Sequence, residues 1–301
     1  MKRILTNTAL LLILFINACT NGVTPLQEDT MPTKDSLPFR SGHAQVNGMS
    51  MYYEIYGEGK PLVLIHGGGS TIQTTFGRVI PALAKHHQLV CVELQAHGRS
   101  GDRPGDISFE QDADDVAALL QYLHIAKADI FGFSNGGNTA LQMAIRHPQV
   151  CNKIIAGSIL LKRSGALPAF WSFMNNGTFE QMPQVYKDAF LQLNNNDSAR
   201  LLNMFHKCAN RMKGFRDFSD EAIRSVTCSV LLINGNADVA TPEHAVAMSK
   251  LLPHCTLLIL PGGHGEYIGE ITTWKPGDKG YEPAIAMIER FIENGTAAGS
   301  Q

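Results

Sequence analysis

The sequence predicts an α/β fold in which an open, mostly parallel sheet is flanked by helices. From residue 43 onward, short apolar segments alternate with helix-like segments, as in a chain of βαβ units. Several of the apolar segments would be apolar on both faces, as expected for parallel strands that helices cover on each side. The 301 residues are enough for a sizeable buried core and for one or two domains.

The expected strands are short apolar runs, at residues 51–56, 62–65, 89–94, 128–133, 154–156, 230–233 and 257–260. The expected helices lie between or after them, at 109–123, 139–146, 245–252 and 284–291. Ser108 is a good N-cap for the first helix, and Thr241 followed by Pro242 suits the start of the third. Pro148 ends the second helix.

Residues 160–224 interrupt this alternation. No strand-like run occurs there, and the segment is rich in Phe, Trp, Met and Asn. We therefore expect a helical insertion between two strands of a core formed by residues 42–159 and 225–296.

Composition and charge exclude several classes of protein. Apolar residues make up 44% and charged residues 17%, which is typical of a globular chain rather than a disordered one. The net charge of −2 requires no basic face, so we expect no nucleic-acid partner. The six cysteines lack close pairs, which excludes a disulfide scaffold and a CxxC zinc site. We expect no metal and no other cofactor.

The N-terminus has the features of an export signal. Lys2 and Arg3 precede an apolar run over residues 9–16, which is far shorter than the roughly 20 residues of a membrane-spanning helix. Ala18 and Cys19 follow, and this junction resembles the lipobox of bacterial lipoproteins. We therefore expect a signal peptide at 1–18, lipidation of Cys19, a polar linker at 19–41 and an exported protein anchored to a membrane of the cell envelope. A signal for soluble secretion stays open.

The remaining five cysteines are an odd number, so at least one is expected to be a free thiol. Cys91 lies in an apolar run, where a buried free cysteine is the ordinary interpretation. A disulfide between Cys228 and Cys255 stays open, and no cysteine has an evident catalytic setting.

A candidate nucleophile lies where an expected strand meets an expected helix. Residues 132–137 read Gly-Phe-Ser-Asn-Gly-Gly, which is the G-x-S-x-G nucleophile elbow in its required context. The turn is so tight that Gly132 and Gly136 must lack side chains, and Ser134 takes a strained conformation with its hydroxyl exposed. The helix that follows favours negative charge near its N-terminus.

The serine needs a base and an acid, which in this arrangement follow in the order Ser, acid, His. His264 lies in a glycine-rich loop directly after the last expected strand, where such sheets place their sites. His244 and His254 sit at a helix start and before a strand, and we interpret both as surface or capping residues. Asp238 follows an apolar strand in a turn, from which it can orient the imidazole of His264.

Residues 65–70 end a strand with three glycines and supply candidate oxyanion donors. Such a loop can direct backbone N–H groups at a carbonyl oxygen, and we assign this role to Gly68. The Asn135 N–H, next to the nucleophile, is the second donor. The loop lacks the patterns of phosphate and dinucleotide sites.

These motifs resemble the α/β-hydrolase superfamily, and the cap-bearing, esterase-like branch fits best over residues 43–294. Residues 66–69 resemble its oxyanion loop, and residues 93–100 resemble its D-x-x-G-H-G-x-S turn with Glu for Asp and Ala for Gly. The resemblance implies that His97 is a structural turn residue and that the 160–224 insertion is a cap over the active site. Ser134 excludes the branches of the fold that use an aspartate nucleophile.

We therefore expect a serine hydrolase that cleaves a carboxylic ester of a small to medium, mainly apolar substrate through an acyl-enzyme. Gly69, Phe133, Trp171 and Phe173 are expected to contact the substrate. Acyl transfer, thioester hydrolysis and C–C bond hydrolysis share the same triad and stay open, as does a non-catalytic binding lipoprotein. The sequence does not indicate an oligomeric state.

Overall fold

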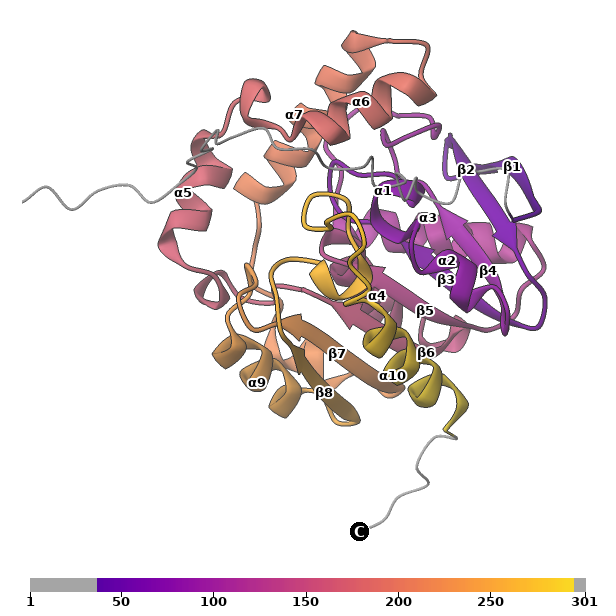
Figure 1. The fold of residues 1–301 in the computed structure, drawn as a ribbon, viewed down its shortest axis with the longest axis vertical. Coiled ribbons are helices and arrows are strands. Elements are labelled where there is room, and N and C mark those ends of the chain that lie inside the picture. Colours follow the sequence, from indigo (N-terminus) through magenta and orange to yellow (C-terminus); the bar gives the residue numbers. More distant parts are fainter. Residues whose placement is uncertain (1–36, 295–301) are drawn as a thin grey trace, which may run out of the picture.

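An eight-stranded sheet forms the centre of the computed structural model, which describes residues 37–294. Its strand order is β1-β2-β4-β3-β5-β6-β7-β8 (Figure 1). β2 is antiparallel to both of its neighbours, β1 and β4, and the pairs from β4 to β8 are parallel. The strands are β1 (Phe39–Val46), β2 (Met49–Tyr56), β3 (Lys60–Ile65), β4 (His87–Val92), β5 (Ala128–Phe133), β6 (Cys151–Gly157), β7 (Ser229–Gly235) and β8 (Cys255–Leu260).

Helices cover both faces of the sheet, and alternate side chains of a strand therefore enter different cores. In β3, Val63 and Ile65 pack with α3, α4 and α9, whereas Leu62 and Leu64 pack with α1, α2 and α10. The helices are α1 (Ile72–Phe76), α2 (Ile80–Leu83), α3 (Phe109–Tyr122), α4 (Asn135–Arg146), α5 (Pro168–Asn176), α6 (Gln184–Leu193), α7 (Ser198–Lys213), α8 (Asp220–Arg224), α9 (Pro242–Leu251) and α10 (Glu282–Glu293).

The predicted fold class is confirmed, and each expected strand and helix of the core has a counterpart within a few residues of its expected bounds. The predicted caps are also present. The Ser108 hydroxyl accepts a hydrogen bond from the Gln111 N–H at the start of α3, and the Thr241 hydroxyl accepts one from the His244 N–H at the start of α9.

The structure differs from the expected linker at its C-terminal end, because residues 39–41 belong to strand β1. This edge strand is largely polar, and of its residues only Ala44 and Val46 are buried, so it has no apolar run to reveal it. The expected signal peptide, Cys19 and most of the linker lie outside the described residues, as do positions 295 and 296 of the expected core.

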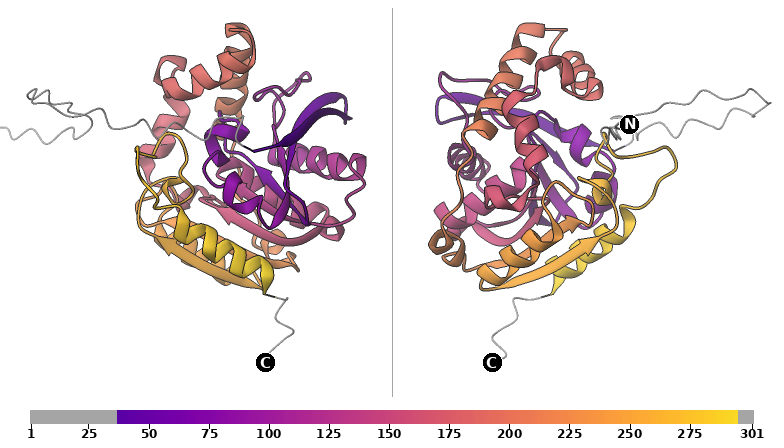
Figure 2. Two further views of the ribbon diagram at one scale, coloured as in Figure 1. Left: turned by 45° about the vertical axis from the view of Figure 1, so that its right-hand side comes forward. Right: turned by 90° about the vertical axis from the view of Figure 1, so that its left-hand side faces the viewer.

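Helices α5, α6 and α7, which we call the cap, gather beyond the carboxyl ends of the parallel strands (Figures 1 and 2). Ion pairs attach α7 to the core. Lys207 lies 2.6 Å from Asp102, and the buried Arg211 lies 2.5 Å from Asp112. Within residues 37–294, no helix combines the length and the apolar character needed to cross a membrane.

Candidate active site

Ser134 occupies a sharp turn between β5 and α4. Its φ of 54° is in the region that L-residues rarely adopt, as the elbow motif predicts. Glycine is required on both sides. A Cβ at Gly132 would lie 2.0 Å from the Gly136 carbonyl oxygen, and a Cβ at Gly136 would lie 2.2 Å from the Ile65 carbonyl oxygen. The sequence therefore presents a half-buried serine hydroxyl at the carboxyl edge of the sheet.

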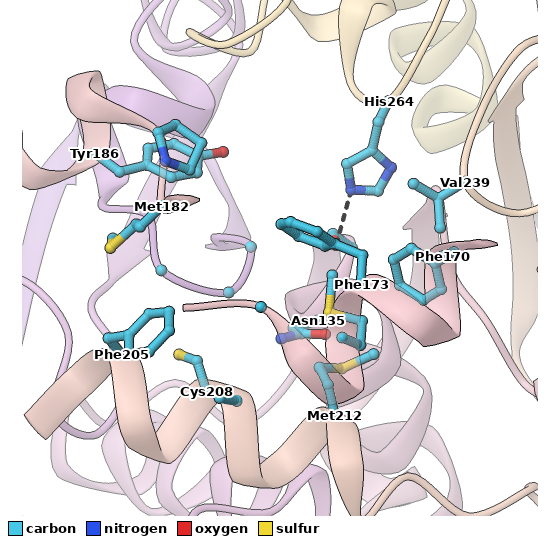
Figure 3. Close-up of a pocket in the computed structure, with 18 of the residues that line it drawn as sticks. Asn135, Phe170, Phe173, Met182, Tyr186, Phe205, Cys208, Met212, Val239 and His264 are labelled. Atoms are coloured by element: carbon cyan, nitrogen blue, oxygen red, sulfur yellow. Dashed lines mark hydrogen bonds between the residues drawn. The ribbon is translucent and has the colours of Figure 1, made fainter. Parts of the chain in front are cut away.

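Three side chains from this edge form one hydrogen-bonded chain. The Ser134 Oγ lies 3.0 Å from the His264 Nε2, and the His264 Nδ1 lies 2.6 Å from the Asp238 Oδ1 (the first contact is dashed in Figure 3). They follow β5, β8 and β7, whose carboxyl ends meet because these strands are parallel. The arrangement lets the imidazole accept the serine proton while the carboxylate holds the ring.

Asp238 is held as a carboxylate by four donors. Burial of its side chain opposes ionisation, but the hydrogen bonds lower the pKa of Asp238 below its usual range. His264 and the Val239 N–H, at 2.6 Å each, donate to Oδ1. The Ser158 hydroxyl at 2.5 Å and the Gly235 N–H at 3.2 Å donate to Oδ2. All four hydrogen bonds favour the charged form that a protonated His264 needs beside it.

Ser158 was not found from the sequence. It follows β6 with a φ of 54°, and its hydroxyl joins Asp238 to the hydroxyl of the buried Tyr267, which is 2.8 Å away. Burial raises the pKa of Tyr267 well above its usual value, so this phenol stays protonated. The only sequence signal for Ser158 is its position directly after an apolar strand.

The two expected oxyanion donors border the same pocket. Among residues 37–294, neither the Gly68 N–H nor the Asn135 N–H has an acceptor. The Gly68 loop is held by His66, whose Nε2 accepts the Leu94 N–H at 3.1 Å and whose Nδ1 lies 2.7 Å from the Gly67 carbonyl. Burial lowers the pKa of His66 well below its usual value, so the ring stays neutral.

A pocket of about 330 Å³ opens in front of Ser134, between the core and the cap (Figure 3). Many of the side chains in its wall are aromatic or thioether groups, among them Phe133, Phe170, Phe173, Met182, Phe205 and Met212. Of the described residues that line it, none is a lysine, arginine, aspartate or glutamate. The pocket therefore suits an apolar, uncharged ligand.

The structure places three of the four expected substrate contacts, Gly69, Phe133 and Phe173, in the wall of this pocket. Trp171 is a correction, because it does not line the pocket. Its indole N–H donates to the Arg163 carbonyl at 2.7 Å, and its ring packs 5.4 Å from that of Phe215. Trp171 anchors helix α5 instead.

Of the two histidines that we expected to be surface or capping residues, one differs from that expectation. His254 is exposed, as expected, but His244 is a second correction. Its side chain is buried, and its Nε2 accepts the Leu161 N–H at 3.1 Å. His97 is buried in the turn that resembles the family motif, with its Nδ1 2.8 Å from the Gln95 carbonyl. Cys228 and Cys255, for which a disulfide stayed open, are free thiols.

The described part of the chain has no group of three or more His, Cys, Asp or Glu side chains arranged to hold a metal ion.

Comparison with known proteins gives relatives among hydrolases. The chain is 28% identical over 209 residues to the 2-hydroxymuconate semialdehyde hydrolase of Pseudomonas sp. strain CF600, which is 62% of this chain and 73% of that protein. Two solved structures share the fold. The enol-lactonase of Burkholderia xenovorans LB400 has a TM-score of 0.66 and 20% identity over 84% of this chain and 100% of its own. Naproxen esterase of Bacillus subtilis has a TM-score of 0.62 and 17% identity, over 85% of this chain and 92% of its own.

Residues 60–240 match the family described as alpha/beta hydrolase fold, and this match covers more than half of the chain. It includes the Gly68 loop, the Ser134 elbow, the cap and Asp238. The chain belongs to the α/β-hydrolase fold family.

Proposed function

We propose that the chain is a serine esterase that hydrolyses carboxylic esters of small to medium, mainly apolar substrates. The observation that carries the proposal is the hydrogen-bonded chain from Ser134 through His264 to Asp238, which opens on an apolar pocket. In this proposal Ser134 is the nucleophile, His264 is the general base and then the general acid, and Asp238 orients the ring.

Acylation begins when the Ser134 oxygen attacks the ester carbonyl and its proton passes to His264 Nε2. Asp238 stabilises the imidazolium through the 2.6 Å contact with Nδ1. The carbonyl oxygen becomes an oxyanion, and the N–H groups of Gly68 and Asn135, which have no acceptor within the described residues, are available to it. His264 then gives its proton to the departing alcohol, and the acyl group stays on Ser134.

Deacylation repeats these steps with water in place of the alcohol. His264 takes a proton from the water, whose oxygen attacks the acyl carbonyl, and the proton then returns to Ser134 as the carboxylic acid leaves. His264 is base and then acid in both halves of the reaction. A thioester in place of the ester, or an acyl acceptor in place of water, would use the same residues, so thioester hydrolysis and acyl transfer remain alternatives within this chemistry.

C–C bond hydrolysis is the second candidate, because curated relatives are named for it. One of them, 24% identical over 242 residues, is the 2-hydroxy-6-oxo-6-(2'-aminophenyl)hexa-2,4-dienoic acid hydrolase of Metapseudomonas resinovorans. A dienoic acid brings a carboxylate into the site. A buried carboxylate needs a charged partner, and the described wall of this pocket offers no lysine or arginine. This supports the ester over the acid as substrate.

Two measurements test the proposal. An alkyl fluorophosphonate should label wild type at Ser134 and leave Ser134→Ala unlabelled, with the site mapped by mass spectrometry. Absence of labelling would favour a non-catalytic binding protein. Purified enzyme should then hydrolyse p-nitrophenyl esters with a higher kcat/KM than a 2-hydroxy-6-oxo-dienoic acid, and the reverse order would make it a C–C hydrolase.

A further inference from the structure

A second nucleophile–base pair lies on the pocket wall opposite His264. Cys208 projects from α7, and its Sγ lies 3.2 Å from the Nε2 of His97. The His97 Nδ1 is 2.8 Å from the Gln95 carbonyl, which can only accept a hydrogen bond. The Nδ1 therefore carries a proton, and in the neutral ring the Nε2 lone pair is shared between the Gly69 N–H at 3.0 Å and the Cys208 thiol. Thiol, imidazole and carbonyl repeat the logic of Ser134, His264 and Asp238.

The thiol can be reached from the pocket, whereas its base cannot. Cys208 is half-buried and lines the same cavity as Ser134, and His97 is fully buried behind it. Figure 3 shows Cys208 beside Phe205 on α7, across the pocket from His264. A reagent must therefore enter the pocket to reach the sulfur, and the apolar wall favours an uncharged one.

The pair makes the thiolate of Cys208 easier to form. Burial opposes charge on both groups, but their mutual attraction and hydrogen bond raise the pKa of His97 and lower the pKa of Cys208. The other charged or titratable groups that act on the pair are Arg211, Asp112 and His66.

Two other half-buried cysteines give an internal comparison. Burial raises the pKa of Cys228 and of Cys255 to about 11 in each case. Cys255 Sγ donates to the Thr256 carbonyl at 3.6 Å, and within the described residues no hydrogen bond joins either thiol to a histidine. The geometry therefore singles out Cys208 as the reactive thiol.

The pair also contacts the oxyanion loop. The Gly69 N–H donates to His97 Nε2 at 3.0 Å, the same atom that Cys208 contacts. Gly69 is adjacent to Gly68, a proposed oxyanion donor. A substituent on the sulfur would both occupy the pocket and disturb the contacts that hold this loop.

We propose that Cys208 is a covalent modification site for small apolar disulfides that enter the pocket, and that its modification blocks the substrate site. This goes beyond the proposed esterase activity and does not depend on it, because the thiol reacts through His97 and not through Ser134.

The reaction is a thiol–disulfide exchange that needs no further co-reactant. The Cys208 thiol passes its proton to His97, and the thiolate attacks one sulfur of the incoming disulfide. A new S–S bond forms on Cys208 as the S–S bond of the reagent breaks. The second half of the reagent leaves as a thiolate and takes up the proton, so the reagent is the oxidant and the cysteine is oxidised. An added dithiol reverses the exchange.

The first test uses 2,2′-dithiodipyridine, a neutral aromatic disulfide, on Ser134→Ala, so that esterase activity plays no part. Peptide mapping at intervals should show Cys208 labelled at least about tenfold faster than Cys228 or Cys255 at pH 7. His97→Asn, checked for folding by circular dichroism, should slow the labelling of Cys208 about tenfold and leave the other two rates unchanged. Labelling of Cys208 no faster than that of Cys228 overturns the proposal, and this comparison needs no His97 variant.

The second test asks whether modification blocks the site. Wild type and the matched control Cys228→Ser should both lose at least about 90% of their untreated esterase activity on labelling and regain it with dithiothreitol. Cys208→Ala should keep its own untreated activity, whatever that is, after the same treatment. Full activity of wild type labelled at Cys208 would overturn the blocking step. Failure of the proposed esterase function would appear instead as absent turnover before any reagent is added.

Discussion

The Ser158 hydroxyl donates a 2.5 Å hydrogen bond to Asp238 Oδ2, the carboxylate oxygen that His264 does not contact. Because a hydroxyl has one proton, the Tyr267 O–H must donate to the Ser158 oxygen across their 2.8 Å contact. The direction of each hydrogen bond is therefore fixed: Tyr267 donates to Ser158, and Ser158 and His264 both donate to Asp238. Ser158 also borders the pocket, and we interpret it as a positioning residue that acts through Asp238.

Loss of this hydroxyl should weaken catalysis without abolishing it. Ser158→Ala removes one of four donors to Asp238 and leaves His264 in place, so we expect kcat to fall about tenfold with KM little changed, as for loss of one hydrogen bond to a charged group. Ser158→Gly also lacks the hydroxyl, but glycine adopts the φ of 54° without strain. Comparison of the two variants therefore separates the effect of backbone strain from that of the lost hydrogen bond. Stopped-flow or steady-state kinetics on a p-nitrophenyl ester measures both variants. Equal kcat for wild type and both variants would show that the hydroxyl does not position Asp238.

The three residues of the hydrogen-bonded chain should act as a unit. Ser134→Ala should abolish turnover, and Asp238→Asn and His264→Ala should each lower kcat about 10⁴-fold, by analogy with serine hydrolase triads. The double variant Asp238→Asn/His264→Ala should be no worse than His264→Ala alone, because Asp238 acts through the imidazole. Near-normal activity of Asp238→Asn would assign the acid to another residue. Circular dichroism of each variant controls for folding.

Strands were predicted best from the sequence where helices bury them on both faces of the sheet. Strand β5 was predicted with the observed bounds because each of its residues is buried, which leaves a mostly apolar run interrupted only by Asp129. Strand β1 was missed because it is an edge strand whose exposed positions carry polar side chains. Short helices such as α2, four residues long, have too few turns for a periodic pattern.

In the site, motifs and their order along the chain predicted Ser134, Asp238 and His264 together, but not a pair of residues that no motif marks. Ser134 and Gly68 were found because a tight turn and a glycine loop constrain the residue types nearby. Cys208 and His97 are 111 positions apart, and only the folded cap brings them together. The sequence also could not separate Trp171 from Phe173, because which side of α5 faces the core is decided by packing against Phe215.

Burial of His244 should make the fold sensitive to mild acid. Burial lowers the pKa of His244 to about 4, and its Nε2 accepts the Leu161 N–H, a hydrogen bond that protonation would break. The unfolded chain binds the proton near pH 6.5, so this stabilisation is complete above that pH and is lost as the pH falls from 6.5 toward 4. The shift corresponds to roughly 2 kcal/mol at pH 5.

Urea unfolding at pH 7.5 and pH 5 measures this loss. His244→Gln does not titrate, so its free energy of unfolding should fall by about 2 kcal/mol less than that of wild type between the two pH values. His254→Gln, at an exposed position, is the matched control and should behave as wild type. If His244→Gln lost as much stability as wild type, the acid sensitivity would have another source.

We also propose that the N-terminus directs lipidation at Cys19, which lies outside the described residues. Stable anchoring requires two or more acyl chains, since one chain binds a bilayer only marginally. The mature protein should therefore sediment with membranes of the cell envelope and dissolve in detergent. Cys19→Ser should block processing or release soluble protein, measured by fractionation and by the mass of the mature N-terminus. Wild type found wholly in the soluble fraction would contradict the anchor.

The pocket should select esters by the length of the acyl chain. Its volume of about 330 Å³ and its wall of phenylalanine and methionine favour added methylenes until the space is filled. Each buried methylene contributes about 0.8 kcal/mol, close to fourfold in kcat/KM. We expect kcat/KM to rise from acetyl to about butyryl or hexanoyl p-nitrophenyl esters and then to fall, with little activity on emulsified long-chain triglyceride.

Two substitutions on helix α7 test the cause of that limit. Phe205 lines the pocket, so Phe205→Ala should move the optimum to a longer acyl chain by enlarging the space. Leu202 lies on the same helix with 40% of its surface exposed and does not line the pocket, so Leu202→Ala should keep the wild-type profile. Equal kcat/KM for acetyl and hexanoyl esters in wild type would show that the apolar wall does not bind the acyl chain. A shift produced equally by both variants would assign the change to the stability of the cap, because Leu202 has no contact with the cavity.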